Sequence, residues 1–396
     1  MKISTITCHD VYNHGASLQA YALMTYLNNQ GHNVEIIDYK PYYMGNLYKL
    51  SNIDNPAWEK NFISKSIYLT LKLPGRLISL KRKKNFDDFT KKYLNVGNYT
   101  YESNEDLKSN LPDADIFICG SDQIWNSLHA NGKDPAFYLD FVPNDKVKAA
   151  YAASFATDTI SDEYKIMTKS LVEKLDKVGV REESGVKIVK DLGIEKAVNV
   201  LDPVFLLEKE QWDNIATKEF NEKYILVYDF DKSLVIEALA KEISKKKGYK
   251  IYTINVDKPK YADKCFNLDG PETFVSLVKN AQFVISNSFH AAVFSLVYEK
   301  DFVIVNRTES INTRMRDLLS SLTIGDRLIG KDYDINKVIE EINYDNVKPI
   351  LNEKIDFSKQ YLYDLLSIKN KNSFYFIVES ELNYEEKNFN NYRFAY

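Results

Sequence analysis

The sequence has little of what defines several large classes of protein. Its 396 residues include only three cysteines, an odd number without the C-x-x-C spacing of a zinc site. No apolar run approaches the roughly 18 residues that cross a membrane, and the N-terminal apolar stretch is too short for a signal peptide. With 52 basic and 56 acidic residues, there is no positive excess to attract nucleic acid. We therefore expect a cytoplasmic protein without a metal site that does not bind nucleic acid.

Histidine is also scarce, and one of the five stands in an informative place. Residues 282–298 predict an apolar strand, a short polar turn and a helix that opens with Phe289 and His290. The carboxyl end of a strand and the N-terminus of the next helix form a common ligand site in open α/β sheets. Two interpretations of His290 stay open: an acid or base of a reaction, or a histidine held by a local cap hydrogen bond.

A similar construction lies near the N-terminus. A β-rich run at residues 2–8 is followed by a loop, a helical pattern that ends at Gly31, and a second β-rich run, which together predict a βαβ unit. At the helix start, Asn13, His14 and Gly15 can present N–H groups and a side-chain amide to a ligand, although an ordinary capped turn explains them as well. The G-x-G-x-x-G pattern is missing, so a dinucleotide site is not indicated.

The chain is long enough for two domains, each with its own core. Strand and helix patterns alternate twice, which predicts α/β folding with two doubly wound, Rossmann-like domains. We place the N-terminal domain at residues 1–210, with a helical, basic insertion at about 41–110. The C-terminal domain is placed at 220–335, and a helical segment at 336–396 is expected to pack back across the first domain.

The insertion contains a helical stretch, residues 63–93, with a marked excess of positive charge. Its basic residues from 72 to 92, opposed only by Asp87 and Asp88, are Lys72, Arg76, Lys81, Arg82, Lys83, Lys84, Lys91 and Lys92. A solvated helix face is one explanation. The other is peripheral contact with anionic lipid or a lipid-linked substrate, because basic residues bind acidic membrane surfaces.

Five short motifs share their order and spacing with one known family over about residues 1–330. They are N-x-G-x-x-L-Q-A-Y at 13–21, G-S-D-Q-I-W at 120–125, V-R-E-E-S at 180–184, L-D-P at 201–203 and S-F-H at 288–290. In this series the chain resembles the polysaccharide pyruvyl transferase family. The resemblance implies a GT-B-like fold, phosphoenolpyruvate as co-substrate without a further cofactor, and a pyruvate ketal on a sugar of a cell-surface glycan. By the same resemblance, His290 matches the catalytic histidine of the family.

The chain departs from the family at one position. Many members carry arginine two residues before this histidine, where the present sequence has Ser288. A donor with a phosphate and a carboxylate needs cationic partners, and the planar guanidinium fits both groups. Arg181, Arg307 and Arg314 are the candidates, each near a predicted strand end, with solvated salt bridges as the alternative for each. Ser288 is also predicted to bind the donor, because the helix that starts there adds partial positive charge where the leaving phosphate could sit.

Ketal formation requires a proton for the methylene carbon of the donor, deprotonated sugar hydroxyls and stabilisation of the departing phosphate. We assign His290 as general acid or base. Asp122 or Asp10 is a candidate to act on the acceptor hydroxyl, unless it is an ordinary loop or cap aspartate. The residues of the cleft loops are predicted to be Asn13, His14, Gly15, Gln19, Gly120, Ser121 and Gln123.

The leading functional hypothesis is therefore pyruvyl transfer to a saccharide during capsule or exopolysaccharide assembly. This hypothesis includes a lipid-linked acceptor and a location at the inner face of the membrane. A GT-B glycosyltransferase that uses a nucleotide sugar is the alternative from another class of enzyme. No recognisable nucleotide-binding pattern in the sequence supports this alternative. A non-catalytic glycan-binding relative is the third hypothesis, which the serine at 288 keeps open.

Overall fold

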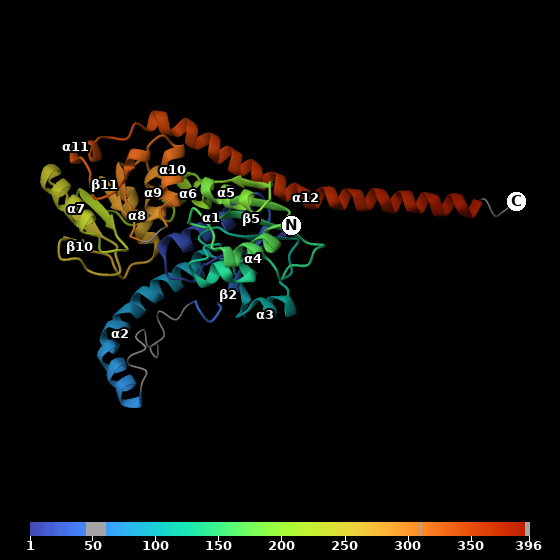
Figure 1. Ribbon diagram of the computed structural model, residues 1–396, viewed down its shortest axis with the longest axis horizontal. Coiled ribbons are helices and arrows are strands. Elements are labelled where there is room, and N and C mark those ends of the chain that lie inside the picture. The colour runs from blue at the N-terminus through green and yellow to red at the C-terminus, as the bar shows by residue number, and fades with distance from the viewer. Residues whose placement is uncertain (45–60, 309–310, 393–396) are drawn as a thin grey trace.

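The computed structural model describes residues 1–44, 61–308 and 311–392, and these form two parallel sheets with helices packed around them (Figure 1). The first sheet has seven strands in the order β3-β2-β1-β4-β5-β6-β7, and the second has six in the order β10-β9-β8-β11-β12-β13. All pairings between these strands are parallel. The predicted class, two Rossmann-like α/β domains in a GT-B-like arrangement, is confirmed.

The first domain alternates strands and helices as its sequence pattern indicates. Its strands are β1 (Lys2–Ile6), β2 (Asn33–Tyr39), β3 (Val96–Tyr101), β4 (Ile116–Cys119), β5 (Val147–Ala153), β6 (Lys177–Val180) and β7 (Ala197–Asn199). Its helices are α1 (His14–Asn29), α2 (Phe62–Tyr93), α3 (Asn104–Ser109), α4 (Asp162–Val172) and α5 (Glu183–Asp191), with 3₁₀ helices η3 (Ala130–Lys133) and η4 (Pro135–Tyr138). Every residue of β4 and β5 is buried, as expected for central strands covered on both faces.

The second domain follows a short linker that contains the 3₁₀ helix η5 (Pro203–Leu206) and α6 (Lys209–Asp213). Its strands are β8 (Tyr224–Tyr228), β9 (Lys250–Thr253), β10 (Lys264–Cys265), β11 (Phe283–Ser286), β12 (Phe302–Val305) and β13 (Leu328–Ile329). Its helices are α7 (Leu234–Lys247), α8 (Pro271–Asn280), α9 (Phe289–Val297), α10 (Thr313–Ser321) and α11 (Ile335–Val338), with the 3₁₀ helix η6 (Gly325–Arg327).

One stretch differs from the prediction. Residues 41–110 were expected to form a helical insertion, whereas residues 96–101 form β3 and extend the edge of the first sheet by pairing with β2. Only Tyr101 of this strand is buried, so the alternation of apolar and polar residues that reveals most strands is weak here. The predicted helix of this stretch is α2, and residues 45–60 lie outside the described residues.

Both sheets reverse their strand order near the centre, between β1 and β4 in the first and between β8 and β11 in the second. In open parallel sheets, the crevice at such a reversal is the usual ligand site, because the connections leave in opposite directions there. Helix α1 follows β1, and α9 follows β11. The N-termini of these two helices therefore mark the expected site in each domain.

The two domains share an apolar core on the side where they meet. This core joins α1 and the linker to helices α8 and α9, and the rings of Trp212 and Phe294 lie 4.8 Å apart within it. Helix α2 also bridges the domains, because the side-chain amide of Asn85 donates a hydrogen bond to the Leu268 carbonyl at 2.8 Å. These contacts fix the position of the α9 N-terminus relative to the α1 N-terminus.

The C-terminal segment is helical, as predicted. Helix α12 (Tyr344–Tyr392) starts at the second domain, crosses the first and extends beyond it (Figure 1). The Tyr361 hydroxyl donates a hydrogen bond to the Ala150 carbonyl of β5 at 2.8 Å, and Lys177 at the start of β6 pairs with Asp364 at 3.5 Å. The helix thus returns to the first sheet.

Candidate active site

His290 is the second residue of α9, and it lies at the junction of the two domains. Ser288 caps this helix by accepting a hydrogen bond from the Ala291 N–H at 3.4 Å. The imidazole is buried, and its Nε2 has no hydrogen-bond partner within the described residues. The carboxylate Oδ2 of Asp202 lies 3.5 Å from Nε2, which is ion-pair distance but longer than an ordinary hydrogen bond. The side of the ring that carries Nε2 thus faces a buried carboxylate.

Asp202 is fully buried in the linker and is held in place by several donors. Arg181 Nη1 donates to its Oδ2 at 2.8 Å, the Val204 N–H donates to its Oδ1 at 3.0 Å, and the Ser121 hydroxyl lies at 3.4 Å. Burial alone would raise the pKa of Asp202, but His290 and Arg181 outweigh this effect and hold the pKa well below its usual range. Asp202 is therefore an ionised carboxylate that orients the imidazole.

The N-terminus of α1 lies against the other nitrogen of the same ring. A Cβ added to Gly15 would lie 2.0 Å from Nδ1 of His290, a separation that no side chain tolerates. Asn13 caps α1, since its side-chain oxygen accepts hydrogen bonds from the N–H groups of Gly15 and Ala16 at 2.9 and 3.3 Å. Glycine at this position thus allows the backbone of the first domain to approach the histidine of the second.

Arg314 is a buried cation with incomplete compensation. Its Nη1 lies 3.9 Å from the Asp122 carboxylate, and its Nε has no hydrogen-bond partner within the described residues. The Gln123 amide lies 3.2 Å from both Nη1 and Nη2, and its oxygen accepts from them when it is turned toward the arginine. Burial and the nearby charge of Arg181 lower the pKa of Arg314 to about 10. A site that destabilises a guanidinium to this extent would be stabilised by a bound anion.

A small pocket of about 80 Å³ lies where these groups meet. The first domain contributes Asn13, Asp122 and Gln123, and the second contributes Phe230, Asn287, Ser288, Phe289, His290, Arg307 and Arg314. Arg307 is oriented by Asp231, whose Oδ1 accepts from its Nη2 at 2.9 Å and its Nε at 3.2 Å. The pocket therefore combines one imidazole, two guanidinium groups and a helix N-terminus, which suits an anionic substrate that undergoes proton transfer.

A family model described as polysaccharide pyruvyl transferase matches residues 13–309, three quarters of the chain. The chain belongs to this family. A comparison with curated proteins gave no match. The matched range runs from Asn13, in the first loop of the pocket, to just beyond Arg307, while Arg314 lies outside it.

Solved structures of other enzymes are similar to this chain over most of its length, at low sequence identity. A putative UDP-N-acetylglucosamine 2-epimerase from Listeria monocytogenes has a TM-score of 0.49 and 10% identity, covering 94% of this chain and 97% of that one. The Rickettsia bellii epimerase has a TM-score of 0.47 and 13% identity over 94% and 97% of the two chains. The Methanocaldococcus jannaschii epimerase has a TM-score of 0.46 and 14% identity over 89% and 93%.

Several predicted site residues of this pyruvyl transferase family member do not line the pocket but lie behind it. Arg181 is buried between Asp202 and Asp122, and its guanidinium lies 4.4 Å from the ring centre of Phe289. Because two carboxylates already compensate its charge, Arg181 holds Asp202 and Asp122 in place behind the pocket. Burial would raise the pKa of Asp122, but Arg181, His290 and Arg314 lower it, so this carboxylate at the pocket wall stays ionised.

Gln19, Gly120 and Ser121 form a second buried layer. The Gln19 side chain donates to the Thr7 hydroxyl at 2.9 Å and accepts from the Ser121 N–H at 3.1 Å, which ties α1 to the loop after β4. Gly120 has φ +117°, and a Cβ there would lie 2.1 Å from the Tyr151 carbonyl. These residues fix the loop that presents Asp122 and Gln123 to the pocket.

His14 is enclosed by aromatic rings. Its ring stacks on Phe274 at 5.4 Å between centres and contacts Phe86 at 4.9 Å and Tyr228 at 5.7 Å. Arg82 Nη1 lies 3.5 Å from its Nε2. Burial, with a smaller contribution from Arg82, lowers its pKa well below the usual value. His14 is therefore a neutral packing residue and not part of the pocket wall.

Four residues at the site were not predicted from the sequence: Asp202, Phe230, Asn287 and Phe289. Asp202 was noted only within the L-D-P motif, and its contact with His290 joins two distant segments of the chain. Phe230 is the second residue after β8, so the rule that ligands collect at strand ends would have found it. Asn287 donates to Asp229 Oδ1 at 2.8 Å and accepts from the Phe230 N–H at 2.9 Å, which holds the two loops together.

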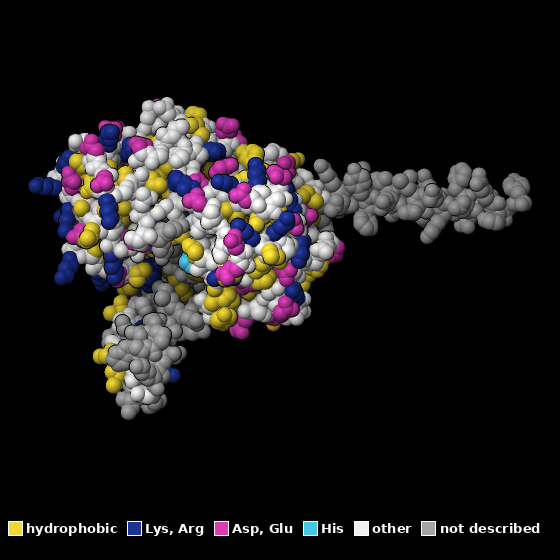
Figure 2. Space-filling view, in the orientation of Figure 1, with side chains coloured by type: hydrophobic (Ala, Val, Ile, Leu, Met, Phe, Trp, Pro, Cys, Tyr) yellow, Lys and Arg dark blue, Asp and Glu magenta, His cyan; other side chains and the backbone are white. Residues whose placement is uncertain are grey.

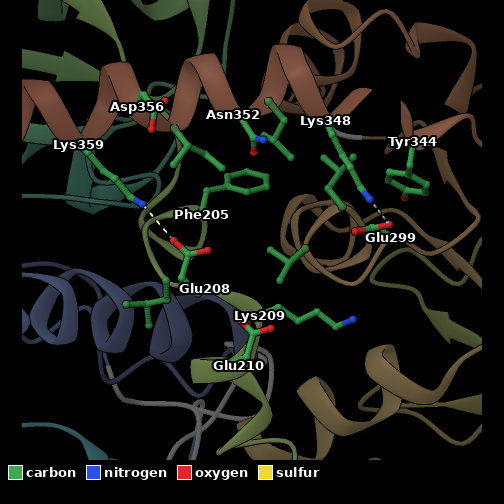
Figure 3. Close-up of a pocket in the computed structure, with 15 residues that line it drawn as sticks. Phe205, Glu208, Lys209, Glu210, Glu299, Tyr344, Lys348, Asn352, Asp356 and Lys359 are labelled. Atoms are coloured by element: carbon green, nitrogen blue, oxygen red, sulfur yellow. Dashed lines mark hydrogen bonds and ion pairs between the residues drawn. The ribbon is translucent and has the colours of Figure 1, made fainter. Parts of the chain in front are cut away.

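A larger pocket of about 480 Å³ lies elsewhere, beneath α12 (Figure 3). Its lining combines apolar side chains such as Phe205 with charged groups that pair with each other. Lys359 binds Glu208 at 3.2 Å and Lys348 binds Glu299 at 2.8 Å. Among the described residues no histidine lines this pocket, and four of its charged groups pair with each other. The smaller pocket around His290 is therefore the stronger candidate for the active site.

No helix within residues 1–44, 61–308 and 311–392 has both the length and the apolar content required to span a bilayer. Within the same ranges no group of three His, Cys, Asp or Glu side chains is arranged to hold a metal ion.

Proposed function

We propose that the protein transfers pyruvate from phosphoenolpyruvate to two hydroxyls of a saccharide and forms a pyruvate ketal. The observation that carries this proposal is the pairing of a buried imidazole with the Asp202 carboxylate, in a pocket that also holds the under-compensated cation Arg314. Membership of the polysaccharide pyruvyl transferase family supports pyruvate transfer to a polysaccharide. The proposal adds the identity of the donor, the ketal product and the roles of the residues.

The cationic side of the pocket suits the two anionic groups of phosphoenolpyruvate. Arg314 and Arg307 lie on the same wall as the N-terminus of α9, whose orphan N–H groups carry partial positive charge. In the proposal, Arg314 binds the carboxylate or phosphate of the donor with its planar fork. Because a bound anion relieves the electrostatic cost of burying Arg314, donor binding and pocket formation favour each other.

The imidazole of His290 performs the proton transfer. In the proposed reaction, protonated His290 delivers a proton to the methylene carbon, and an acceptor hydroxyl attacks the adjacent carbon. A second hydroxyl then attacks the same carbon, and the bond to phosphate breaks. Of the two hydroxyl protons, one returns to His290 and the other leaves with phosphate. The ionised Asp202 lies 3.5 Å from Nε2 and keeps the ring oriented throughout this cycle.

The first domain provides the acceptor side. Asp122 and Asn13 line the pocket opposite α9, and Asp122 stays ionised beside its arginines. A carboxylate with a lowered pKa is a weak base but a good acceptor of hydrogen bonds. We assign Asp122 to orient the acceptor hydroxyl. The acceptor itself is proposed to be a sugar of a capsule or exopolysaccharide precursor, including its lipid-linked form.

The decisive experiment measures phosphate release from phosphoenolpyruvate in the presence of galactose- or mannosamine-bearing saccharides. We expect acceptor-dependent release of phosphate and a product whose mass increases by one pyruvate ketal. Parallel reactions contain UDP-sugars in place of phosphoenolpyruvate. Transfer from a UDP-sugar without any reaction of phosphoenolpyruvate would replace the proposal with a glycosyltransferase. Saccharide binding without either reaction would identify a non-catalytic relative.

A further inference from the structure

The two halves of α2 have opposite environments. Its C-terminal half is embedded between the domains, where Phe86 and Phe89 are buried and Arg82 donates hydrogen bonds to the Tyr12 and Asn267 carbonyls at 3.0 and 3.3 Å. Its N-terminal half projects away from both domains (Figure 1). Figure 2 shows apolar side chains along the left edge of this projection. A helix so firmly anchored at one end holds the other end in a defined direction.

Large apolar side chains are exposed on the projecting half. Leu71 is 70% exposed, Ile78 57%, Leu77 53% and Ile67 47%. At 3.6 residues per turn, positions 67, 71 and 78 fall within an arc of about 40°, so they form one stripe along the helix. Contiguous exposed leucine and isoleucine residues are unfavourable in water and typically mark an interaction surface. A merely solvated helix face does not explain this stripe.

The charge of the same segment has one sign. Residues 61–86 contain no acidic residue, in a protein whose net charge is −4. The basic residues of this segment are Lys65, Lys72, Arg76, Lys81, Arg82, Lys83 and Lys84. Lys65 and Lys81 are exposed. At 3.6 residues per turn, Lys81 lies about 60° around the helix from the centre of the apolar stripe and Lys65 about 140°. An apolar stripe with basic residues on the other faces of the helix is the pattern of helices that lie in the interface of an anionic bilayer.

The same charge argues against a second copy of the chain as the partner. Two α2 segments that met along their apolar stripes would gather their basic residues around one contact, with no acidic residue of residues 61–86 on either copy to compensate them, and such an accumulation of like charge is unfavourable. Anionic lipid headgroups provide the opposite charge, while the acyl boundary accepts the leucine side chains. The observations therefore favour a lipid surface over self-association.

We propose that the N-terminal half of α2 docks the protein on an anionic lipid surface. The other end of the same helix, with Arg82 and Phe86, lies beside the loops that carry Tyr12 and Asn267 at the domain junction. Docking through α2 therefore turns this side of the domain junction toward the lipid surface. A saccharide attached to a lipid in that surface then lies on the side of the protein from which α2 projects. This docking does not depend on the proposed reaction.

The apolar part of the proposal is tested by sedimentation with vesicles of phosphatidylglycerol and phosphatidylcholine, and with vesicles of phosphatidylcholine alone. We expect the protein to bind the anionic vesicles at least about tenfold more tightly. The double variant Leu71→Asp/Ile78→Asp should lose at least about tenfold in binding, because each change removes a buried apolar side chain and adds a repelled charge. The matched control is Ile166→Asp on α4, where the isoleucine is 84% exposed.

The electrostatic part is tested with Lys65→Gln/Lys81→Gln. Each exposed basic residue contributes about 1 kcal/mol near an acidic membrane, so we expect binding to weaken by roughly tenfold to thirtyfold. The control is Lys245→Gln/Lys247→Gln, which removes the same charge from exposed lysines at the end of α7. Raising the salt concentration should weaken binding by the wild-type protein because exposed charges are screened.

Three results would overturn the proposal: no vesicle binding at low salt, equal losses in the α2 variants and their controls, or a dimer in sedimentation velocity that Leu71→Asp/Ile78→Asp abolishes. Unchanged thermal unfolding of the variants would exclude misfolding as the cause of a loss. Phosphate release with a soluble acceptor should be unchanged in the α2 variants. Failure of the proposed reaction would therefore appear in that assay and leave vesicle binding intact.

Discussion

Two histidines occupy almost the same local position and have different environments. His14 is the first residue of α1 and His290 is the second residue of α9, and each helix follows a strand that lies where the strand order of its parallel sheet reverses. Both rings are buried. His290 faces the Asp202 carboxylate and lines a pocket, whereas His14 is enclosed by aromatic rings and Arg82. A position at a helix N-terminus therefore does not decide the role of a histidine.

The neighbours decide that role through charge. His290 lies beside the ionised Asp202 carboxylate, 3.5 Å from its Nε2, and at the wall of a pocket that a substrate can enter. Beside a guanidinium and without contact to water, the imidazolium form of His14 is destabilised. The contrast makes His290 a candidate for chemistry and His14 a candidate for packing, and four predictions test it.

The largest effect is expected for His290→Gln. Glutamine keeps a polar side chain at the pocket but cannot exchange a proton at neutral pH, so kcat for phosphate release should fall by about 10² to 10⁴-fold. His290→Ala should be similarly impaired. Thermal unfolding, measured in parallel, should change little, because Arg181 still compensates Asp202. Release of phosphate by His290→Gln at nearly the wild-type rate would exclude this ring from the mechanism.

A smaller but still large effect is expected for Gly15→Ala. The added methyl group would lie 2.0 Å from Nδ1 of His290, so the ring or the α1 N-terminus must move. Displacement of a reacting group by about 1 Å costs up to about 10²-fold in rate, and we expect kcat to fall by that order. Gly75→Ala is the control, since nothing lies within 4 Å of its Cβ position. Equal activity of both variants would show that α1 does not hold His290 in place.

The sequence predicts the parts of this site that depend on local pattern. Strand and helix signals located the loops after β1, β4 and β11, and parallel sheets bring the carboxyl ends of their strands to one edge. This is why Asn13, Asp122 and His290 were selected together from residues far apart in the chain, and the structure places all three at one pocket.

The remaining features depend on contacts between elements that carry no local signal. The enclosure of His14 results from the packing of α2 and α8, which contribute Phe86 and Phe274. The pairing of Asp202 with His290 depends on how the linker passes beneath α9. Strand β3 was missed because an exposed edge strand lacks the alternation that marks a half-buried strand.

An intermediate effect is expected for Arg314→Lys. Lysine keeps the charge but replaces a planar fork by a point donor, so the KM for phosphoenolpyruvate should rise by about tenfold while kcat changes less. Steady-state kinetics at saturating acceptor measure both constants. The control is Arg316→Lys, two residues further along α10, where the side chain is bound to Asp158 and half exposed. If both variants keep the wild-type KM, Arg314 does not bind the donor.

The smallest effect on activity is expected for His14→Phe, which preserves the aromatic packing around Phe86, Tyr228 and Phe274. We expect kcat within about twofold of the wild-type value, in contrast to the loss in His290→Gln. A catalytic role for His14 would instead appear as a loss of at least tenfold.

Stability provides the second half of this test. Because the pKa of His14 is lower in the folded state, the unfolded chain takes up its proton first as pH falls. The contribution of His14 to stability is therefore complete above the unfolded pKa of about 6.5 and decreases below it, by up to about 1.4 kcal/mol per pH unit. The phenylalanine variant has no side chain at position 14 that can take up this proton. Between pH 7 and pH 5 its free energy of unfolding should fall less than that of the wild type, as measured by urea denaturation at each pH. Equal decreases in the free energy of unfolding of both proteins would mean that His14 is not held neutral by burial, and the contrast with His290 would be lost.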